Sequence, residues 1–263
     1  MKAKIHLSIV SHGQGEMVGH LLDDLRILAE TDDICLTLTL NVKEILPFDP
    51  KAFPFPIQVV ENSIPKGFGA NHNAAFYKFQ NDSAYFCVVN PDIRVRGRVF
   101  EHLLGCIEQE GKAGVVAPLV RSSLGEIEDS ARPLPTPWII LAKVFGLERK
   151  VSLPAVECGS VDWVAGMFML FPREVYARLG GFDSRYFLYY EDVDLCCRLH
   201  LGGFKVLLSL LAEVEHDAQR ASHGNLKYFL WHFRSLSRFF LSPIFFRRWW
   251  QIRQASLGMA EGE

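Results

Sequence analysis

Residues 84–92 read AYFCVVNPD, an uncharged apolar run that ends in Asn90, Pro91 and Asp92. A strand with no polar face predicts burial on both sides, which is typical of parallel sheets covered by helices on both faces. The Asn-Pro pair predicts a turn directly after the strand. Asp92 is therefore expected where open α/β sheets bind their ligands, at the carboxyl end of a buried strand. An ordinary turn without function is the alternative.

Similar apolar runs lie on both sides of this strand, and helical patterns separate them. The N-terminal half predicts strands at residues 5–11, 34–40, 57–61 and 113–117, and helices at residues 21–28, 69–79 and 98–110. Strands that alternate with helices of this length predict βαβ units. The expected fold class is α/β, with a mostly parallel twisted sheet and helices on both faces.

The C-terminal half is less regular. Its patterns predict a strand at residues 162–171, helices from Pro172 and at residues 191–201, and strands at residues 205–209 and 212–216. Residues 122–161 are rich in proline and predict a long functional loop with a short helix near residues 138–145. Residues 225–253 predict a helical tail, which Pro243 divides into two helices.

Composition restricts the class of protein. The chain has 263 residues, of which 49% are hydrophobic and 22% charged, as in globular proteins. Its apolar runs fall far short of the ~20 residues that span a bilayer, and its N-terminus has no signal-peptide pattern. The six cysteines show no CxxC spacing, so we expect buried free thiols in a reducing compartment. The expected protein is cytoplasmic, either soluble or lying on a membrane.

Charge is distributed unevenly along the chain. Residues 218–260 contain seven basic residues and no acidic one, whereas the rest of the chain has 21 basic and 30 acidic residues. The basic tail is also rich in aromatic side chains, and it has three interpretations. It packs on the rest of the protein as a helical cover, it lies in the interface of an anionic membrane, or it binds single-stranded nucleic acid, for which nothing else in the sequence provides support.

Two glycines indicate a candidate phosphate loop. Residues 65–73 read PKGFGANHN, and Gly67 and Gly69 stand directly before a predicted helix. Glycine allows the backbone to approach a ligand closely, and the start of a helix favours an anion. The stretch is neither a Walker loop nor a complete dinucleotide fingerprint, because the third glycine is absent.

A second long stretch contains candidate acids. Residues 180–195 read GGFDSRYFLYYEDVDL, and Glu191 and Asp192 stand at the start of a predicted helix. The preceding aromatic run predicts an apolar pocket, in which a general base can be tuned. Helix capping is the alternative. His216 follows an apolar strand, where a histidine has either a functional or a structural role.

The order of these motifs resembles the inverting glycosyltransferases of family 2, which have a GT-A fold, and above all their rhamnosyltransferase-like branch. The resemblance covers residues 4–222 and depends mainly on GGFDSRYFLYYEDVDLCCRL, residues 180–199. It implies a catalytic domain at residues 1–222, with a nucleotide-sugar half at about 1–120 and an acceptor half at about 121–222. Residues 223–263 would form a basic aromatic extension.

The resemblance also implies roles for single residues. Asp192 is the implied general base, with Glu191 as the rival for that role. Asp92 and His216 are the implied ligands of Mg²⁺ or Mn²⁺. The residues implied to contact the donor nucleotide or its diphosphate are Ser11, His12, Asn41, Gly67, Gly69, Asn73 and Asn90.

The implied activity is metal-dependent transfer of a sugar, with rhamnose as the first expectation, from a dTDP-, UDP- or GDP-linked donor. The implied acceptor is a hydroxyl of a glycan or of a lipid-diphosphate-linked glycan in the synthesis of a surface polysaccharide, at the inner face of the cell membrane. No nucleic-acid partner is expected. A nucleotidyltransferase and a catalytically inactive donor-binding or scaffold protein are the two alternatives.

Overall fold

The computed structural model of the protein describes residues 4–29, 32–79, 82–144, 153–216 and 226–260. Its strands are β1 Lys4–Ser11, β2 Asp33–Leu40, β3 Ile57–Glu61, β4 Tyr85–Val89, β5 Ile93–Val95, β6 Ala113–Ser122, β7 Ala131–Arg132, β8 Cys158–Ser160, β9 Trp163–Val164, β10 Phe168–Pro172 and β11 Lys205–His216. Its helices are α1 Gly15–Leu28, α2 Phe68–Lys78, α3 Val99–Gln109, α4 Pro137–Val144, α5 Arg173–Leu179, α6 Glu191–Leu201, α7 Leu226–Phe240 and α8 Pro243–Ala260, with a 3₁₀ turn at Pro50–Ala52.

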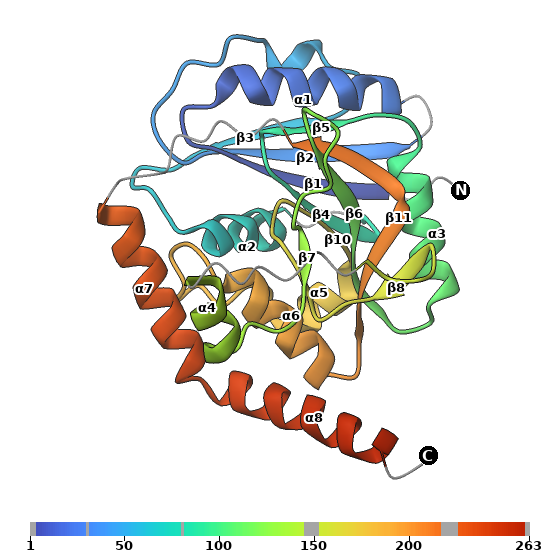
Figure 1. Cartoon of the computed structure of the whole chain (residues 1–263). Coiled ribbons are helices and arrows are strands. Elements are labelled where there is room, and N and C mark those ends of the chain that lie inside the picture. The colour runs from blue at the N-terminus through green and yellow to red at the C-terminus, as the bar shows by residue number, and fades with distance from the viewer. Residues whose placement is uncertain (1–3, 30–31, 80–81, 145–152, 217–225, 261–263) are drawn as a thin grey trace.

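One large sheet runs through the molecule (Figure 1) in the strand order β3-β2-β1-β4-β10-β6-β11-β5, and β8 pairs with the side of β11. The first four strands are parallel, so that Leu7 of β1 lies between Leu36 of β2 and Cys87 of β4. Strand β10 runs antiparallel to both β4 and β6. This reversal places the start of β10 beside the end of β4, where Asn90, Pro91 and Asp92 follow.

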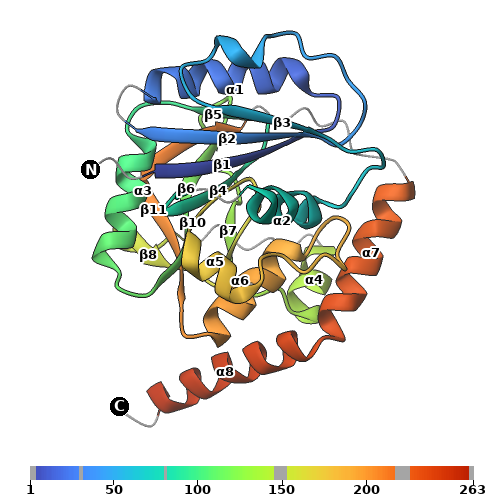
Figure 2. The same cartoon turned by 180° about the vertical axis from the view of Figure 1, so that it is seen from behind.

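Helices cover both faces of the sheet, as predicted (Figures 1 and 2). Helices α1 and α3 pack on one face through side chains such as Leu21 and Phe100. Helices α2, α5 and α6 pack on the opposite face, where Phe76, Tyr176 and Leu195 are almost fully buried. Strand β4 supplies both cores, because its alternate residues point to opposite faces. The predicted α/β class is confirmed.

The boundaries of several elements differ from the prediction. The strand expected at residues 162–171 is divided into two strands by a turn at residues 165–167: β9 pairs with β7 in a separate two-stranded sheet, and β10 belongs to the large sheet. The two strands expected at residues 205–209 and 212–216 are one strand, β11, with a register irregularity between Ser209 and Glu213. The division of the tail at Pro243 is confirmed. The predicted domain boundary between residues 222 and 223 lies outside the described residues.

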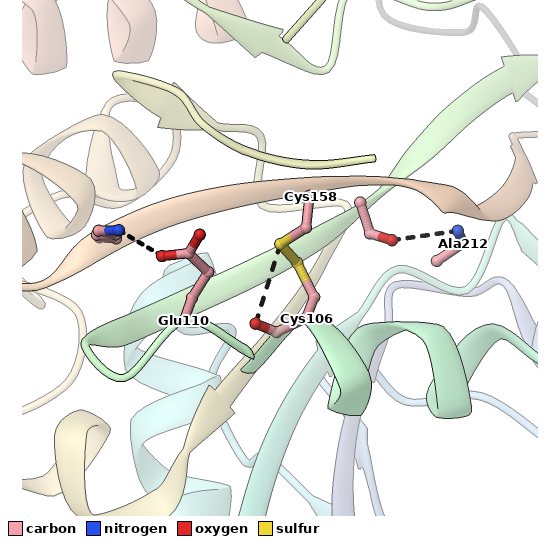
Figure 3. Close-up of a disulfide and its surroundings, with 6 residues drawn as sticks. Cys106, Glu110, Cys158 and Ala212 are labelled. Carbon is pink, nitrogen blue, oxygen red and sulfur yellow. Dashed lines mark hydrogen bonds and ion pairs between the residues drawn. A yellow bond between two sulfur atoms is a disulfide. The ribbon is translucent and has the colours of Figure 1, made fainter. Parts of the chain in front are cut away.

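The prediction of six free thiols is wrong for two cysteines. Cys106 at the end of α3 and Cys158 in β8 form a disulfide, as Figure 3 shows beside strand β11. The two residues are 52 positions apart, and only the pairing of β8 with β11 brings them together. Cys87, Cys196 and Cys197 are buried thiols, as predicted.

Helices α7 and α8 pack on the body of the protein. Phe239 and Phe245 are buried against the α6 side of the sheet, and Arg248 forms an ion pair with Asp162, with 2.8 Å between its Nη2 and the Oδ1 of the carboxylate. The interpretation of the tail as a helical cover is thus confirmed for the inner side of both helices. None of the described helices combines the length and the apolar content that crossing a bilayer requires.

Candidate active site

The first part of the site is the turn after β4. The backbone N–H of Asn90 donates to the carbonyl of Met167 (2.8 Å), which fixes the turn against the start of β10. Asp92 follows, and its Oδ2 accepts a hydrogen bond from Nε2 of His216 (3.2 Å). Its other oxygen, Oδ1, is buried and has no hydrogen-bond partner among the described residues. An orphaned carboxylate oxygen of this kind is costly unless something binds it.

His216 ends β11 and lies between two carboxylates. Its Nδ1 donates to Oε2 of Glu128 (2.7 Å), while its Nε2 faces Asp92. The hydrogen bond with Asp92, supported by the charges of both carboxylates, raises the pKa of His216 to about 9. Glu128 was not predicted from the sequence, because 88 positions separate it from His216 and nothing distinguishes it from the neighbouring acids Glu126 and Asp129.

These side chains suit a hard divalent cation. Asp92 offers one oxygen that is unpartnered within the described residues. Nε2 of His216 could bind a cation once it has released its proton, and the carboxylate of Glu128 on Nδ1 is the usual support of a histidine ligand. No cluster of three or more His, Cys, Asp and Glu residues that could hold a metal ion occurs in the described part of the chain. Asp92 and His216 could supply two protein ligands of a cation, and water and substrate phosphates would then complete its coordination.

The second part of the site is the start of α6. Asp192 keeps part of its surface exposed, and its carboxylate accepts hydrogen bonds from the backbone N–H of Gly166 (3.0 Å) and of Val193 (2.8 Å). Burial raises the pKa of Asp192, while these N–H groups and the charge of Arg132 oppose the rise. The carboxylate is thus held in a fixed direction and is more basic than an exposed aspartate.

Glu191 has a different environment, although it is the neighbour of Asp192 in the sequence. Its side chain is buried, and its Oε2 lacks a hydrogen-bond partner within the described structure. Burial, and then the charge of Asp192, raise the pKa of Glu191 to about 8. Glu191 is therefore mostly protonated at neutral pH, whereas a general base needs to be ionised and reachable.

Backbone strain marks the turn before these acids. Tyr189 and Tyr190 have φ angles of 71° and 66°, a left-handed conformation that is costly for residues with bulky side chains. Helix α7 packs against this turn: its His232 contacts both tyrosine rings, and Ser235 Oγ donates to the carbonyl of Leu188 (2.8 Å). Strain of this kind persists only where the surrounding structure enforces it, and it is common at active sites.

A short turn joins the two parts of the site. Gly166 donates its N–H to Asp192, and the next residue, Met167, accepts the N–H of Asn90. Gly166 also lies close to Phe68, since an added Cβ would stand 3.1 Å from that ring. The structure therefore brings Asp92, His216 and Asp192 to the same edge of the sheet, at the carboxyl ends of the parallel strands.

Three predicted donor residues lie at the ends of β1 and β2. Asn41 is buried, and its Nδ2 donates to Nδ1 of His12 (3.0 Å) and to the carbonyl of Lys66 (2.9 Å). Its Oδ1 accepts from Asn62 and from the backbone N–H of Lys66. Asn41 thus fixes the loop before α2, while His12 is exposed beside it. Ser11 is buried, and its hydroxyl caps the turn that leads into α1.

Of the four remaining predicted donor residues, Asn90 lies in the turn after β4, and Gly67, Gly69 and Asn73 hold α2 against the 180–190 segment. A Cβ on Gly67 would lie 2.6 Å from the carbonyl of Phe187, and one on Gly69 would lie 2.5 Å from Phe182. Asn73 accepts hydrogen bonds from Tyr176 Oη and from the N–H of Phe182, and it donates to the carbonyl of Phe182. Close packing alone accounts for these residues, and their contact with the nucleotide stays a prediction.

Known proteins with similar sequences are sugar transferases. Rhamnosyltransferase WbbL of Escherichia coli K12 is 28% identical over 249 residues, which cover 89% of this chain and 92% of that protein. The chain is thus similar to a rhamnosyltransferase over most of its length. It is also 31% identical, over 146 residues, to N-acetylglucosaminyl-diphospho-decaprenol L-rhamnosyltransferase of Mycobacterium tuberculosis, and the match covers 49% of the chain and 45% of that protein. No family model matches the chain.

Solved structures confirm the GT-A fold of the chain. GalNAc-T7 with UDP, GalNAc and Mn²⁺ superposes with a TM-score of 0.64 and 16% identity, over 84% of this chain and 44% of that one. Mannosyltransferase PcManGT of Pyrobaculum calidifontis with GDP-Man and Mn²⁺ superposes with a TM-score of 0.56 and 13% identity, over 85% of this chain and 59% of that one. The chain thus spans about half of each of these two proteins.

Proposed function

We propose that the protein is a metal-dependent inverting glycosyltransferase that transfers rhamnose from dTDP-rhamnose, with UDP- and GDP-sugars as the alternative donors. The names of the E. coli and M. tuberculosis relatives support rhamnose as the sugar. The placement of Asp92 and His216 on one side of the Gly166-Met167 turn, with Asp192 on the other, is the observation that carries the proposal. Such a layout suits a donor diphosphate at one end and an acceptor hydroxyl at the other.

Asp192 is the proposed general base. It would take the proton of the acceptor hydroxyl as that oxygen attacks the anomeric carbon, from the face opposite the departing nucleoside diphosphate. A single displacement of this kind inverts the anomeric centre. Glu191 stays protonated beside it, because two neighbouring buried carboxylates are not both easily ionised. A positioned base typically contributes ~10²–10⁴-fold to the rate.

Asp92 and His216 are the proposed ligands of Mg²⁺ or Mn²⁺. The cation would neutralise charge on the departing diphosphate, which is electrostatic stabilisation of the leaving group. Glu128 fixes the orientation of the His216 ring through Nδ1, so we infer that it is a positioning residue. Contacts of the donor with Ser11, His12, Asn41, Gly67, Gly69, Asn73 and Asn90 complete the proposed site.

The proposed acceptor is a hydroxyl of a glycan or of a lipid-diphosphate-linked glycan in surface polysaccharide synthesis. The name of the mycobacterial relative includes an N-acetylglucosaminyl-diphospho-decaprenol group, which supports a lipid-linked acceptor. The protein would then work in the cytoplasm at the inner face of the membrane. Residues 1–222 would form the catalytic domain, with the donor half at about 1–120, and residues 223–263 the extension.

Thermal unfolding with nucleotide sugars tests the proposal. A donor at a hundredfold excess over its dissociation constant stabilises the folded state by about 2.7 kcal/mol, and we expect one donor to do so only in the presence of Mg²⁺ or Mn²⁺. Asp92→Ala should lose this shift. Asp192→Asn should keep the shift and lose turnover by about a hundredfold or more.

Glu128→Gln serves as a matched variant at the cation site. It keeps an oxygen that His216 can reach but removes the charge, and we expect affinity for Mn²⁺ to fall by about tenfold to a hundredfold in a titration without donor. Full turnover by Asp192→Asn would exclude Asp192 as the base. A donor shift without turnover toward any acceptor would instead support the inactive donor-binding protein.

A further inference from the structure

The outer side of α7 is apolar, although it points away from the core. Leu226, Phe229, Leu230 and Phe233 follow the spacing i, i+3, i+4 and i+7, which places them on one side of a helix. Each of them is more than half exposed, whereas Ser235 and Phe239 on the opposite side are buried against the body. The solvent side of a helix in a globular protein is usually polar, so this stripe lacks an ordinary explanation.

Helix α8 continues the apolar surface. Phe246, Trp249 and Trp250 lie on its outer side, and Leu241 lies at the corner between the two helices. The eight residues of this surface, which we call the tail face, are Leu226, Phe229, Leu230, Phe233, Leu241, Phe246, Trp249 and Trp250. All except Trp249 expose between 55% and 79% of their surface. Isolated exposed apolar residues are common, but eight of them on two consecutive helices indicate an interaction surface.

Positive charge accompanies the tail face. Residues 226–260 contain six basic residues and no acidic one. Arg248 forms an ion pair with Asp162, and the guanidinium of Arg238 lies over the ring of Tyr186. Arg234 and Arg247 are exposed on α7 and α8, and Arg253 lies over the ring of Trp249. The surface therefore combines Trp and Phe side chains with a surplus of positive charge.

We propose that the tail face binds the headgroup region of an anionic lipid bilayer. Apolar and aromatic side chains would enter the interface, and the arginines would contact lipid phosphates. A second copy of this chain is the less favourable occupant, because a symmetric pairing would bring two basic surfaces together. The absence of acidic residues between positions 226 and 260 favours the anionic surface for the same reason.

Binding there would place the active site close to the lipid. The inner side of α7 packs on the turn before Glu191 and Asp192, through the stacking of Trp231 on Phe187 and the contacts of His232. In Figure 1, strand β1 runs from the N-terminus toward the side of the molecule on which α7 lies. The idea of a membrane-borne acceptor rests on the proposed function, whereas the docking of the tail face does not depend on catalysis.

Flotation with lipid vesicles tests the docking without donor or acceptor. We expect the full chain to float with vesicles of phosphatidylglycerol and phosphatidylcholine in equal parts, and far less with phosphatidylcholine alone. The double substitution Phe229→Ser and Phe233→Ser should weaken partitioning at least about tenfold. Arg234→Gln and Arg247→Gln should each weaken it about fivefold, and only at low salt.

The matched control carries Ile45→Ser and Leu124→Ser, two exposed apolar residues outside the tail that expose 96% and 85% of their surface. This control should float as the unaltered chain does. Circular dichroism checks that each variant is folded, and donor-induced thermal shifts report separately on the catalytic proposal. Equal flotation of the tail-face variants and the unaltered chain would overturn the inference. Loss of a dimer instead of vesicle binding in these variants would assign the surface to a second copy.

Discussion

Asp192 and Glu191 show how position within one helix turn separates two chemically similar residues. Asp192 is reachable and accepts two backbone hydrogen bonds, whereas Glu191 is buried with one unpartnered oxygen in the described structure. The sequence left these two residues as rivals for the role of base. The difference in burial favours Asp192, and it also gives Glu191 a measurable effect on stability.

Glu191 should make the protein less stable as the pH rises. Its pKa is raised from 4.5 to about 8 in the folded protein, so folding favours the protonated form. The contribution of protonated Glu191 to the free energy of unfolding is present in full below pH 4.5, and it is lost as the pH rises through about 8. Glu191→Gln cannot ionise, and we expect its free energy of unfolding to depend less on pH across this window.

Urea unfolding at several pH values compares the two proteins. Glu108→Gln, at a carboxylate in α3 on the opposite face of the sheet, is a suitable control and should follow the unaltered chain. Parallel curves for Glu191→Gln and the unaltered chain would show that Glu191 is ionised throughout, and would remove the reason for preferring Asp192.

Some residues of the candidate site could be predicted from the sequence and others could not. The hydrophobic pattern drew attention to Asp92, Asp192 and His216, because each follows or begins an element that it defines, and the resemblance to known glycosyltransferases implied their roles. The structure brings all three to one edge of the sheet. Glu128 could not be predicted, since it meets His216 only after β6 and β11 have paired. The packing of Asn73 on the 180–190 segment could not be predicted either, because Asn73 and Phe182 are 109 positions apart in the sequence.

At the scale of elements, the contact between α2 and the 180–190 segment needs a glycine on the side of that segment as well. Gly181 has a φ of 69°, and an added Cβ would stand 2.2 Å from Oδ1 of Asn73. Gly180 has a φ of 74°, but an added Cβ there would meet nothing within 4 Å. The two glycines are thus adjacent, equally left-handed, and different only in their surroundings.

Gly180→Ala should cost roughly 1–2 kcal/mol of unfolding free energy, the usual penalty for a left-handed alanine. Gly181→Ala should cost more, because it also displaces the hydrogen bonds of Asn73 to Tyr176 and Phe182. Chemical denaturation measures both values. Equal costs would mean that Asn73 moves aside freely and does not hold the two elements together.

The order of the elements was largely predictable, whereas their pairing was not. Hydrophobic periodicity indicated the strands at residues 5–11, 34–40 and 84–89 because it is a local property of the chain. The turn at residues 165–167 separates β9 from β10, which runs antiparallel to β4. That turn contains Gly166, whose backbone N–H donates to Asp192. The local pattern of apolar residues therefore failed at the point where the chain passes from the small sheet to the large one.

At the scale of the whole molecule, the disulfide between Cys106 and Cys158 should stabilise the fold. It closes a loop of 52 residues, for which the loss of chain entropy predicts roughly 4 kcal/mol. We expect a reductant to lower the urea midpoint of the unaltered chain and to leave that of Cys106→Ser with Cys158→Ser unchanged. Insensitivity of the unaltered chain to reductant, with both thiols open to alkylation, would contradict the bond.

Helix α7 has two faces with separate roles, and both depend on the same register. Its inner face packs on the strained turn of Tyr189 and Tyr190, and its outer face is half of the tail face. Each residue of an α-helix turns the chain by about 100°. A single inserted or deleted residue near the middle of α7 would rotate its two halves against each other and disturb both faces together. Changes in the length of this helix should therefore be tolerated far less than changes in its composition.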